Sequence, residues 1–420
     1  MIDQEEDEGQ EKKNTLNLES LPTDVLLCIF KFCELELLGR ISQVCKRFYW
    51  IINEDYVWIE RAKNILVTNQ ISEHIRNRSL TTLSLKEKCR IYYNWKNGKY
   101  KENIYLRQRE KYMPKLVLEK GILWISRGSS ILAYKRDKDY CLSRRPIVVL
   151  EGQREDVCHF VKCGNVIISG ERYGALVGWS ANTGKKTFEL KNGHSSDVNS
   201  VDNVGCLIIS GSRDETVKVW NISDPSTCEE SFSIDIGDRV CSVALSPNAD
   251  VFCCGSAGLH NISPLHIFDS ASGISVVNLD YSFRNGAGIL DVHWETPQTL
   301  LSCGYDTLIR LWDIRIGRCV SLWEDPYDSA IYSLASDNHN TFLSGLSQHG
   351  RIQLWDKRKK DSIQTYFSKT RWSSPVYGMV FDPSHLFAAL DQSLNVFDFS
   401  GRGNMSKNLF SVPHTIIQVI

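Results

Sequence analysis

The feature that most constrains this fold is an aromatic residue that recurs from residue 115 onward. Each copy ends a short β-like run after a polar turn, and most copies are followed by Asp. Neighbouring copies lie 41 to 48 residues apart, and they are Tyr134, Trp179, Trp220, Phe268, Trp312, Trp355 and Phe397. A period of about 44 residues is typical of propellers whose blades are four-stranded sheets. The sequence therefore predicts a seven-bladed β-propeller over residues 115–420.

The N-terminal part has a different pattern, in which apolar residues recur at helical spacing. Pro22 suits the first turn of a helix, and Val25 and Ile29 follow on one stripe. A second stripe covers residues 37–48, and a third short segment covers residues 53–61. Three helices this short expose more apolar surface than they can bury among themselves, because so small a domain has little interior. This surplus of exposed apolar surface predicts that residues 18–62 bind a partner.

Two further segments flank this three-helix module. Residues 1–17 are acidic and polar with little to bury, which predicts a disordered tail. Residues 63–114 interleave Lys and Arg with Leu, Ile, Tyr and Trp95. We interpret them as a helical basic linker with packed apolar faces and solvated lysines, and an RNA-binding strip is the alternative. A rigid linker would fix the distance between the two ends of the molecule.

Composition narrows the classes of function. The 420 residues include 49 Lys and Arg and 50 Asp and Glu, so the net charge of -1 gives no general attraction to nucleic acid or to anionic membranes. The 14 cysteines are scattered, and the acidic start lacks a signal segment. No apolar run approaches the roughly 20 residues that cross a bilayer. We therefore expect a reducing, cytoplasmic location, with the nucleus as a further possibility.

Motifs for metals and cofactors are missing from the sequence. No pair of Cys or His residues has the spacing of metal ligands, and no nucleotide-binding loop occurs. We therefore expect neither a metal site nor a cofactor.

The helical module resembles the F-box, on the strength of Leu21-Pro22, the acidic Asp24, the run Val44-Cys45-Lys46-Arg47-Phe48 and a closing Trp58. In that family the module docks onto a Skp-type adaptor, which hangs from a cullin scaffold that carries the ubiquitin-transfer machinery. A helical cap for the domain behind it is the alternative. The resemblance implies a set of adaptor-binding residues, which are Leu21, Pro22, Val25, Leu26, Ile29, Phe30, Leu38, Ile41, Val44, Cys45, Phe48 and Trp58.

The repeats resemble WD repeats, most closely from Gly193-His194 to Trp220. In that family a His, a Ser and an Asp form a buried network that ends on the ring nitrogen of the Trp. The resemblance implies this network in two repeats, as His194, Ser210, Asp214 and Trp220 in the third and as Ser302, Asp306 and Trp312 in the fifth. A Ser-His-Asp triad for acyl transfer is the alternative. The fifth repeat keeps the network without a His, which favours the structural role.

The same resemblance implies where a substrate would bind. Two positions in each blade point to one face around the central channel: the residue before the turn Asp, and the residue after the apolar residue that begins the innermost strand. These positions are Arg172, Asn199, Arg213, Asp291, Tyr305, Tyr332, Gln348 and Tyr377. The arginine fork matches the oxygens of a carboxylate or a phosphate. We hypothesise that this face binds an acidic or phosphorylated peptide, and the alternative is that Arg172 and Arg213 pair with blade carboxylates.

As a whole, the chain resembles the F-box/WD-repeat proteins. The resemblance implies a non-catalytic substrate receptor of a Skp-cullin-F-box ubiquitin ligase, which holds a substrate near the ubiquitin donor for proteasomal degradation. Three alternatives are a scaffold that leads to no degradation, a nucleic-acid-associated propeller that uses the basic linker, and a hydrolase built on His194, Ser210 and Asp214.

Overall fold

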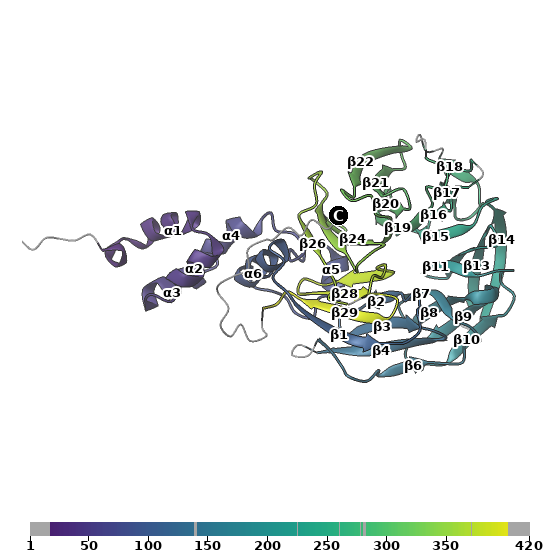
Figure 1. Cartoon of the computed structure of the whole chain (residues 1–420), viewed down its shortest axis with the longest axis horizontal. Helices are drawn as coiled ribbons and strands as arrows, with labels where there is room; N and C mark the ends of the chain where they lie inside the picture. Colours follow the sequence, from purple (N-terminus) through teal and green to yellow (C-terminus); the bar gives the residue numbers. More distant parts are fainter. Residues whose placement is uncertain are drawn as a thin grey trace, which may run out of the picture.

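The computed structural model describes residues 17–137, 141–224, 226–259, 261–277, 279, 283–370 and 372–401. N-terminal helices precede a ring of seven β-sheets, so the predicted fold class is confirmed (Figure 1). The predicted disordered tail lies outside the described residues except for Asn17. Among the described helices, none has the length and apolar character to span a membrane.

The helical part consists of short helices joined by brief turns. They are η1 (Leu18–Ser20), α1 (Thr23–Phe32), α2 (Leu35–Ile41), α3 (Lys46–Asn53), α4 (Tyr56–Ala62), α5 (Glu73–Arg78) and α6 (Leu85–Lys96). Four α-helices therefore occupy the described residues of the module, where the sequence predicted three. The second predicted stripe is divided because Cys45 is extended and its sulfur accepts a hydrogen bond from the Phe48 amide at 3.4 Å, which caps α3.

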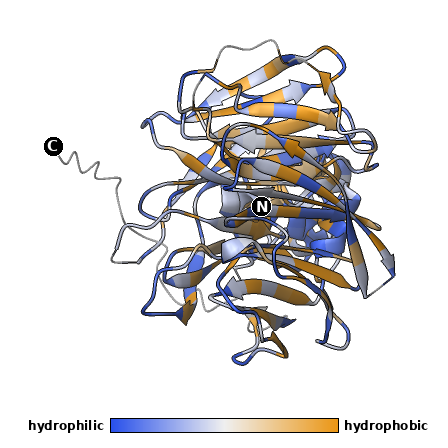
Figure 2. Cartoon of the chain, turned by 90° about the vertical axis from the view of Figure 1, so that its right-hand side faces the viewer, coloured by the Kyte–Doolittle hydropathy of each residue, from blue (hydrophilic) through white to orange (hydrophobic). Residues whose placement is uncertain are grey.

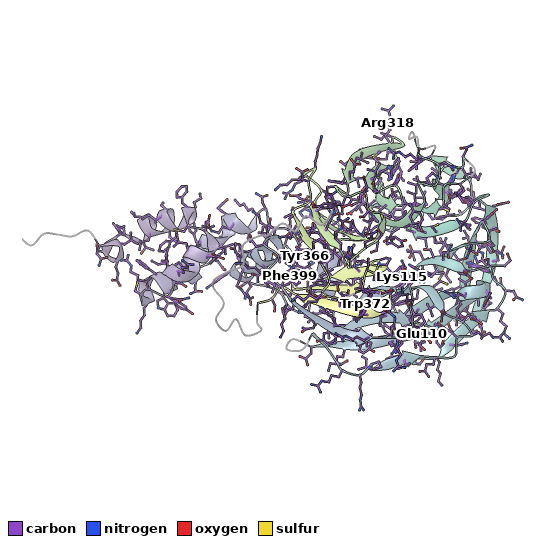
Figure 3. All side chains as sticks on the ribbon, viewed as in Figure 1. Glu110, Lys115, Arg318, Tyr366, Trp372 and Phe399 are labelled. Carbon is purple, nitrogen blue, oxygen red and sulfur yellow. The ribbon has the colours of Figure 1, made fainter. Side chains whose placement is uncertain are left out.

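Helix α6 belongs to two buried cores at once. Its Cys89 lies in the apolar cluster of the helical module, and its Trp95 lies in the cluster formed by the last two blades. Trp95 stacks on Phe399 with ring centroids 3.7 Å apart, and its indole N–H donates to the Pro383 carbonyl at 2.9 Å. Phe399 and Tyr366, which both pack against Trp95, are labelled in Figure 3. Because both cores share this helix, α6 fixes the module relative to the propeller.

Each blade is an antiparallel sheet whose first three strands follow one another outward from the centre in chain order, with β1 joining last in the seventh blade. The first blade contains β2 (Leu116–Leu118), β3 (Ile122–Arg127), β4 (Ser130–Asp137), β5 (Cys141–Leu142) and β6 (Val148–Leu150). The second contains β7 (Val157–Cys163), β8 (Val166–Glu171), β9 (Leu176–Ser180) and β10 (Lys186–Leu190), with the 3₁₀ turn η2 (Arg172–Gly174). The third contains β11 (Val198–Val204), β12 (Leu207–Ser212), β13 (Thr216–Asp224) and β14 (Thr227–Asp235).

The remaining blades repeat this order. The fourth contains β15 (Val240–Leu245), β16 (Val251–Ser256), β17 (Leu265–Asp269) and β18 (Ser275–Val277). The fifth contains β19 (Ile289–Thr296), β20 (Thr299–Gly304), β21 (Leu308–Asp313) and β22 (Arg318–Glu324). The sixth contains β23 (Ile331–Ser336), β24 (Thr341–Leu346), β25 (Ile352–Asp356) and β26 (Gln364–Tyr366). The seventh contains β27 (Gly378–Phe381), β28 (His385–Ala389), β29 (Ser393–Asp398) and β1 (Lys101–Arg107).

The seven recurring aromatic residues all lie on the third strand of their blades. The strands are largely coloured as hydrophobic residues, and many of the loops are coloured as hydrophilic ones (Figure 2). First strands of neighbouring blades contact one another around the centre. The repeat therefore marks one equivalent position in each blade.

Strand β1 departs from the predicted linker. It pairs antiparallel with β29, from Lys101 opposite Asp398 to Arg107 opposite Ser393, and it supplies the outer strand of the seventh blade. The stretch from residue 101 to 107, which the sequence placed in a helical linker, is therefore part of the propeller. Pairing between the two ends of the propeller closes the ring and covers β29, an edge strand that would otherwise lack a partner.

Residues 67–72 of the linker lie against one face of the propeller. Residues 108–112 pass the β28–β29 turn on the other face, where the Gln108 amide donates to the Gln392 carbonyl and the Tyr112 amide to the Asp391 carbonyl, both at 3.0 Å. The Val67 amide donates to Thr341 Oγ1 at 3.0 Å, and Ser72 Oγ donates to the Asp337 carbonyl at 2.5 Å. Both contacts lie at the start of β24, whereas the loop of residues 347–351 follows its far end. We call the face that carries α5 and α6 the linker face, and the face with the loops at 305–307 and 347–351 the open face.

Candidate adaptor and substrate surfaces

The predicted adaptor-binding residues divide by burial. Five of them are at most 5% exposed, and they are Leu26, Phe30, Leu38, Phe48 and Trp58. In this structure they form the core of the helical module and do not reach its surface. This corrects the prediction that these five residues contact the adaptor. Successive helical residues point about 100° apart, which turns one half of each apolar stripe inward and the other half outward.

The outward half of the predicted set consists of Pro22, Val25, Ile29 and Val44, which are exposed. Leu21, Ile41 and Cys45 are partly buried. Sequence reasoning missed several exposed apolar residues, which are Phe32, Leu37, Tyr49, Trp50, Tyr56 and Ile59. Phe32 is 88% exposed and follows Ile29 by three residues, so helical spacing alone could have found it. We call Val25, Ile29, Phe32, Leu37 and Val44 the adaptor surface.

Two arginines hold α1 in place beneath this surface. The Arg61 guanidinium donates to the carbonyls of Phe30, Lys31 and Cys33 at 2.7–2.9 Å, which satisfies the end of α1. Arg47 donates to the Leu21 carbonyl at 2.6 Å at the other end of the helix. The exposed side chains therefore project from a helix whose two ends are fixed.

Three lysines of the linker make contacts within the protein. Lys86 Nζ donates to Asn53 Oδ1 at 2.6 Å, Lys88 Nζ donates to the Asn69 carbonyl at 3.1 Å, and Lys99 Nζ pairs with Glu36 Oε1 at 2.7 Å. These contacts favour a packed linker over an RNA-binding strip.

The third blade contains the predicted network of polar side chains. His194 Nε2 lies 2.7 Å from Ser210 Oγ, and the Trp220 indole N–H donates to the same oxygen at 2.8 Å. His194 Nδ1 lies 3.1 Å from Asp214 Oδ2. Burial lowers the pKa of His194. Burial acts to raise the pKa of Asp214, but hydrogen bonds from Thr216 and the Ser195 amide lower it to about 2.

This arrangement has the order of an acyl-transfer triad without its accessibility. Ser210 is fully buried, and its oxygen accepts the indole N–H, so a substrate carbonyl has no approach to it. The fifth blade repeats the end of the network, where the Trp312 indole N–H donates to Ser302 Oγ at 2.8 Å and Asp306 pairs with Arg310. The geometry therefore favours the structural role over the hydrolase alternative.

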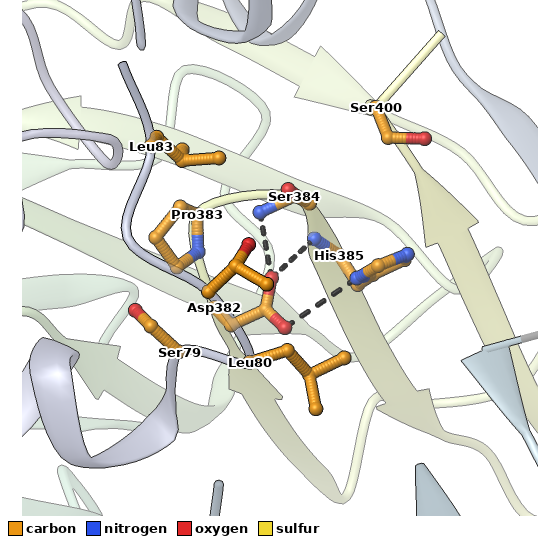
Figure 4. A pocket seen from close by; sticks show the side chains of 9 residues that line it. Ser79, Leu80, Leu83, Asp382, Pro383, Ser384, His385 and Ser400 are labelled. Carbon is orange, nitrogen blue, oxygen red and sulfur yellow. Dashed lines mark hydrogen bonds and ion pairs between the residues drawn. The ribbon is translucent and has the colours of Figure 1, made fainter. Parts of the chain in front are cut away.

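A second Asp-His-Ser grouping, which sequence reasoning missed, lines a pocket of about 40 Å³ on the linker face (Figure 4). Asp382 accepts hydrogen bonds from the Ser384 and His385 amides at 2.6 and 2.8 Å, and its other oxygen lies 3.4 Å from His385 Nδ1. His385 Nε2 lies 3.7 Å from Asp398 Oδ1. Both imidazole nitrogens therefore face carboxylates, and neither is placed to activate a hydroxyl.

The two predicted arginines of the open face each lie beside a carboxylate. Arg172 Nη1 is 4.0 Å from Asp156 Oδ2, and Arg213 Nη1 is 4.0 Å from Asp197 Oδ2. Both side chains are about half exposed. A separation of 4.0 Å is longer than a hydrogen bond, so both arginines also stand within reach of an external anion. The geometry leaves both interpretations of this pair standing.

The three predicted tyrosines form a row across blades five to seven. The Tyr305 and Tyr332 rings are 6.0 Å apart at 89°, and the Tyr332 and Tyr377 rings are 5.7 Å apart at 87°. Gln348 is exposed on the neighbouring loop. Asn199 is used within the propeller, because its side-chain amide donates to the Val240 carbonyl at 2.7 Å.

Asp291 does not share the position of the other predicted face residues. Ile289 pairs with Gly304 and Asp291 with Cys303, which makes Asp291 equivalent to Ser200 of the third blade. Asp291 Oδ2 accepts the Leu334 amide of the next blade at 2.7 Å, as Ser200 Oγ accepts the Val243 amide at 3.1 Å. The first strands of blades two to six all have a bulge at this point. β19 differs because two apolar residues, Ile289 and Leu290, begin it, so counting along the sequence gave a register shifted by one.

Across the described part of the chain, no cluster of three or more His, Cys, Asp or Glu side chains is placed to hold a metal ion.

Comparison with known proteins agrees with both the helical module and the propeller. The F-box-like family matches residues 18–63, and the family of the WD domain, G-beta repeat, matches residues 184–221, 279–313 and 317–356. A helical F-box joined to a WD-repeat propeller defines the class of F-box/WD-repeat proteins.

Similar proteins from other organisms identify the family within this class. The F-box/WD repeat-containing protein 4 of Homo sapiens is 38% identical over 90% of this chain and 92% of its own length. Its counterpart in Mus musculus is 37% identical over the same shares. The WD repeat-containing protein 25 of Mus musculus is 27% identical over 46% of this chain and 36% of its own length. The chain belongs to the family of F-box/WD repeat-containing protein 4.

Proposed function

We propose that this chain is the substrate-recognition subunit of a Skp-cullin-F-box ubiquitin ligase. One observation carries the proposal: a single helix, α6, joins the core beneath an exposed apolar F-box surface to the core of a propeller whose opposite face exposes Arg172, Arg213 and Tyr305. A partner on each surface would be held at a fixed separation. We expect the complex in the cytoplasm, with the nucleus as a further possibility.

In this proposal the chain performs no bond chemistry. The F-box binds a Skp-type adaptor, and the open face binds the protein that receives ubiquitin and is then degraded. Holding both on one body raises the local concentration of substrate lysines near the ubiquitin donor, to the millimolar range typical of linked partners. The burial of Ser210 supports a role in binding over one in hydrolysis.

The substrate hypothesis for the open face is an acidic or phosphorylated peptide held by Arg172 and Arg213. Its support is that both guanidinium groups are exposed on neighbouring blades and that neither carboxylate approaches closer than 4.0 Å. Alanine at both positions should weaken capture of such a peptide while the adaptor still binds.

A reconstituted ligase tests the proposed function. Ile29→Ala and Phe32→Ala each remove an exposed apolar contact, and we expect each to weaken adaptor binding by about 1–3 kcal/mol. Ile274→Ala, which truncates an exposed apolar residue of the propeller, is the matched control and should leave adaptor binding unchanged. Binding is measured with purified adaptor.

Ubiquitin transfer to a propeller-bound protein separates a receptor from a scaffold. A receptor transfers ubiquitin only when its F-box is intact. Adaptor binding without transfer to any captured protein would favour the non-degradative scaffold instead.

A further inference from the structure

Helix α5 lies against the linker face of the propeller and contacts several blades. Before its first turn, the Ser72 hydroxyl donates to the Asp337 carbonyl of blade six at 2.5 Å. At its end, the Arg78 carbonyl accepts a hydrogen bond from Arg136 of blade one at 2.6 Å. Between these contacts, Ile75 packs into the core shared with blades six and seven. The helix is therefore fixed to the propeller at both ends and along its apolar side.

His74 and Arg78 project together from this helix. Arg78 follows His74 by four residues, so the two side chains lie on the same side of α5. The His74 ring is 5.9 Å from the ring of His293, which lies on β19, the innermost strand of blade five. Arg76 and Asn77, on the other side of the helix, are exposed. The side that carries His74 and Arg78 therefore faces the innermost strands of the ring.

Neither His74 nor Arg78 has the partner that its burial calls for. His74 Nε2 and Arg78 Nη1 are both buried, and neither forms a hydrogen bond within the described part of the chain. Burial lowers the pKa of Arg78 to about 10, and burial together with Arg78 and His293 lowers the pKa of His74 to about 2. A guanidinium group taken out of water without a counter-ion is costly, and a bound anion would offset that cost.

The carboxylates of the neighbouring elements are used elsewhere. Asp337 accepts two backbone amides, from His339 at 2.8 Å and from Thr341 at 2.9 Å. One oxygen of Asp337 stays without a partner, but burial raises the pKa of this carboxyl, which disfavours its charged form. Glu295 pairs with Lys357 at 2.5 Å, and one of its oxygens also lacks a partner.

Asp382 is the carboxylate nearest the end of α5, and it pairs with Arg136. Within the described residues, neither it nor the other two carboxylates forms an ion pair with Arg78. Positive charge is therefore uncompensated on the side of α5 that faces the ring.

A small oxyanion matches the groups that lie here. The guanidinium fork binds two oxygens of a phosphate at once, and an imidazole can donate one further hydrogen bond to it. Both residues as a whole remain partly exposed, so an ion from solution can reach their remaining nitrogens.

We propose that Arg78 and His74 bind a phosphate-type oxyanion between α5 and the innermost strands of the propeller. The anion is either free inorganic phosphate or the phosphoryl group of a larger molecule. It would compensate the buried charge and strengthen the junction between the linker and the ring. The inference goes beyond the proposed function, because this site lies on the linker face and contacts none of the residues assigned to adaptor or substrate.

Thermal unfolding of the full chain tests the proposal, with chloride, inorganic phosphate, sulfate and glycerol phosphate compared at equal ionic strength. Phosphate near saturation should raise the unfolding temperature by about 2 °C or more over chloride, because it binds the folded state alone. A rise with glycerol phosphate as well assigns the site to a phosphoryl group on a larger molecule. A rise with inorganic phosphate and sulfate alone assigns it to a free ion.

Variants separate binding from the general stabilising effect that phosphate and sulfate have on proteins. Arg78→Met removes the charge and keeps the length of the side chain, so it should lose the rise that depends on binding. In chloride it should unfold at the same temperature as the unaltered chain or higher, because a buried charge without a partner is gone. Arg76→Met replaces an exposed arginine of the same helix and is the matched control, which should keep the full rise.

A direct measurement accompanies these temperatures. Phosphorus NMR follows the line broadening of inorganic phosphate by the unaltered chain and by Arg78→Lys. The lysine keeps the charge without the fork, so we expect it to weaken phosphate binding about tenfold. This comparison decides the question even where Arg78→Met does not fold.

Two results would overturn the inference: a phosphate-dependent rise of equal size in Arg78→Met and the unaltered chain, or equal line broadening by the unaltered chain and Arg78→Lys. Adaptor binding and ubiquitin transfer are measured on the same proteins in chloride. If both persist, the proposed function stands whatever the anion result.

Discussion

Arg136 carries a positive charge into the interior where the first and last blades meet. Its side chain is fully buried and pairs with Asp382, whose side chain is 3% exposed. Arg136 also donates to the carbonyls of Arg78 and Glu119, at 2.6 and 3.0 Å. One side chain thus joins blade one, blade seven and the linker. Geometry of this kind offsets the desolvation of a buried charge only while every partner is present.

Removing one member of the Arg136–Asp382 pair should lower the free energy of unfolding far more than removing a surface ion pair. We expect Asp382→Ala to lower the free energy of unfolding by about 3–5 kcal/mol, because it leaves the Arg136 charge buried without its partner. Lys63→Ala is the control: its pair with Glu60 is 58% exposed on both sides and should contribute under about 1 kcal/mol. Urea unfolding measures both. Equal losses for the two variants would mean that the buried pair does not hold the ring closed.

At the scale of elements, the sequence predicted what repeats and missed what occurs once. The seven aromatic residues identified seven blades because each occupies the same strand of its own sheet. Strand β1 has no such marker: its partner, β29, lies almost 300 residues further along the chain, and no local pattern reveals that pairing. The cap at Cys45 was missed for a related reason, since it depends on one hydrogen bond from the Phe48 amide to the Cys45 sulfur, which apolar periodicity does not encode.

The role of β1 can be tested with two fragments of the propeller. A fragment that starts at Lys115 follows the boundary predicted from sequence and leaves β29 as an exposed edge. A fragment that starts at Lys101 keeps the closing strand. We expect the shorter fragment to aggregate or unfold at a lower temperature, since an uncovered edge strand invites pairing with other chains. Size-exclusion chromatography and thermal unfolding compare the two, and indistinguishable behaviour would show that closure by β1 is dispensable.

At the scale of the whole molecule, the sequence could identify the two surfaces but not which side chains each of them exposes. The F-box pattern identified the module correctly, but five of its twelve predicted contact residues lie in the core, because a helical stripe alone does not say which half faces outward. On the open face the tyrosines were predicted as single positions. Their arrangement as a row depends on the ring closure that brings blades five, six and seven side by side.

A receptor of this design needs both surfaces on the same molecule. Ile29→Ala should reduce adaptor binding and spare the open face, whereas Tyr305→Ala should spare adaptor binding and reduce substrate capture. An equal mixture of the two variants contains each surface intact but on different chains. Because only linkage on one chain raises the effective concentration of the substrate, the mixture should transfer ubiquitin no faster than the mean of the two variants measured separately. Full recovery in the mixture would mean that two copies act together, so that the bridge between adaptor and substrate is not confined to the α6 connection of a single chain.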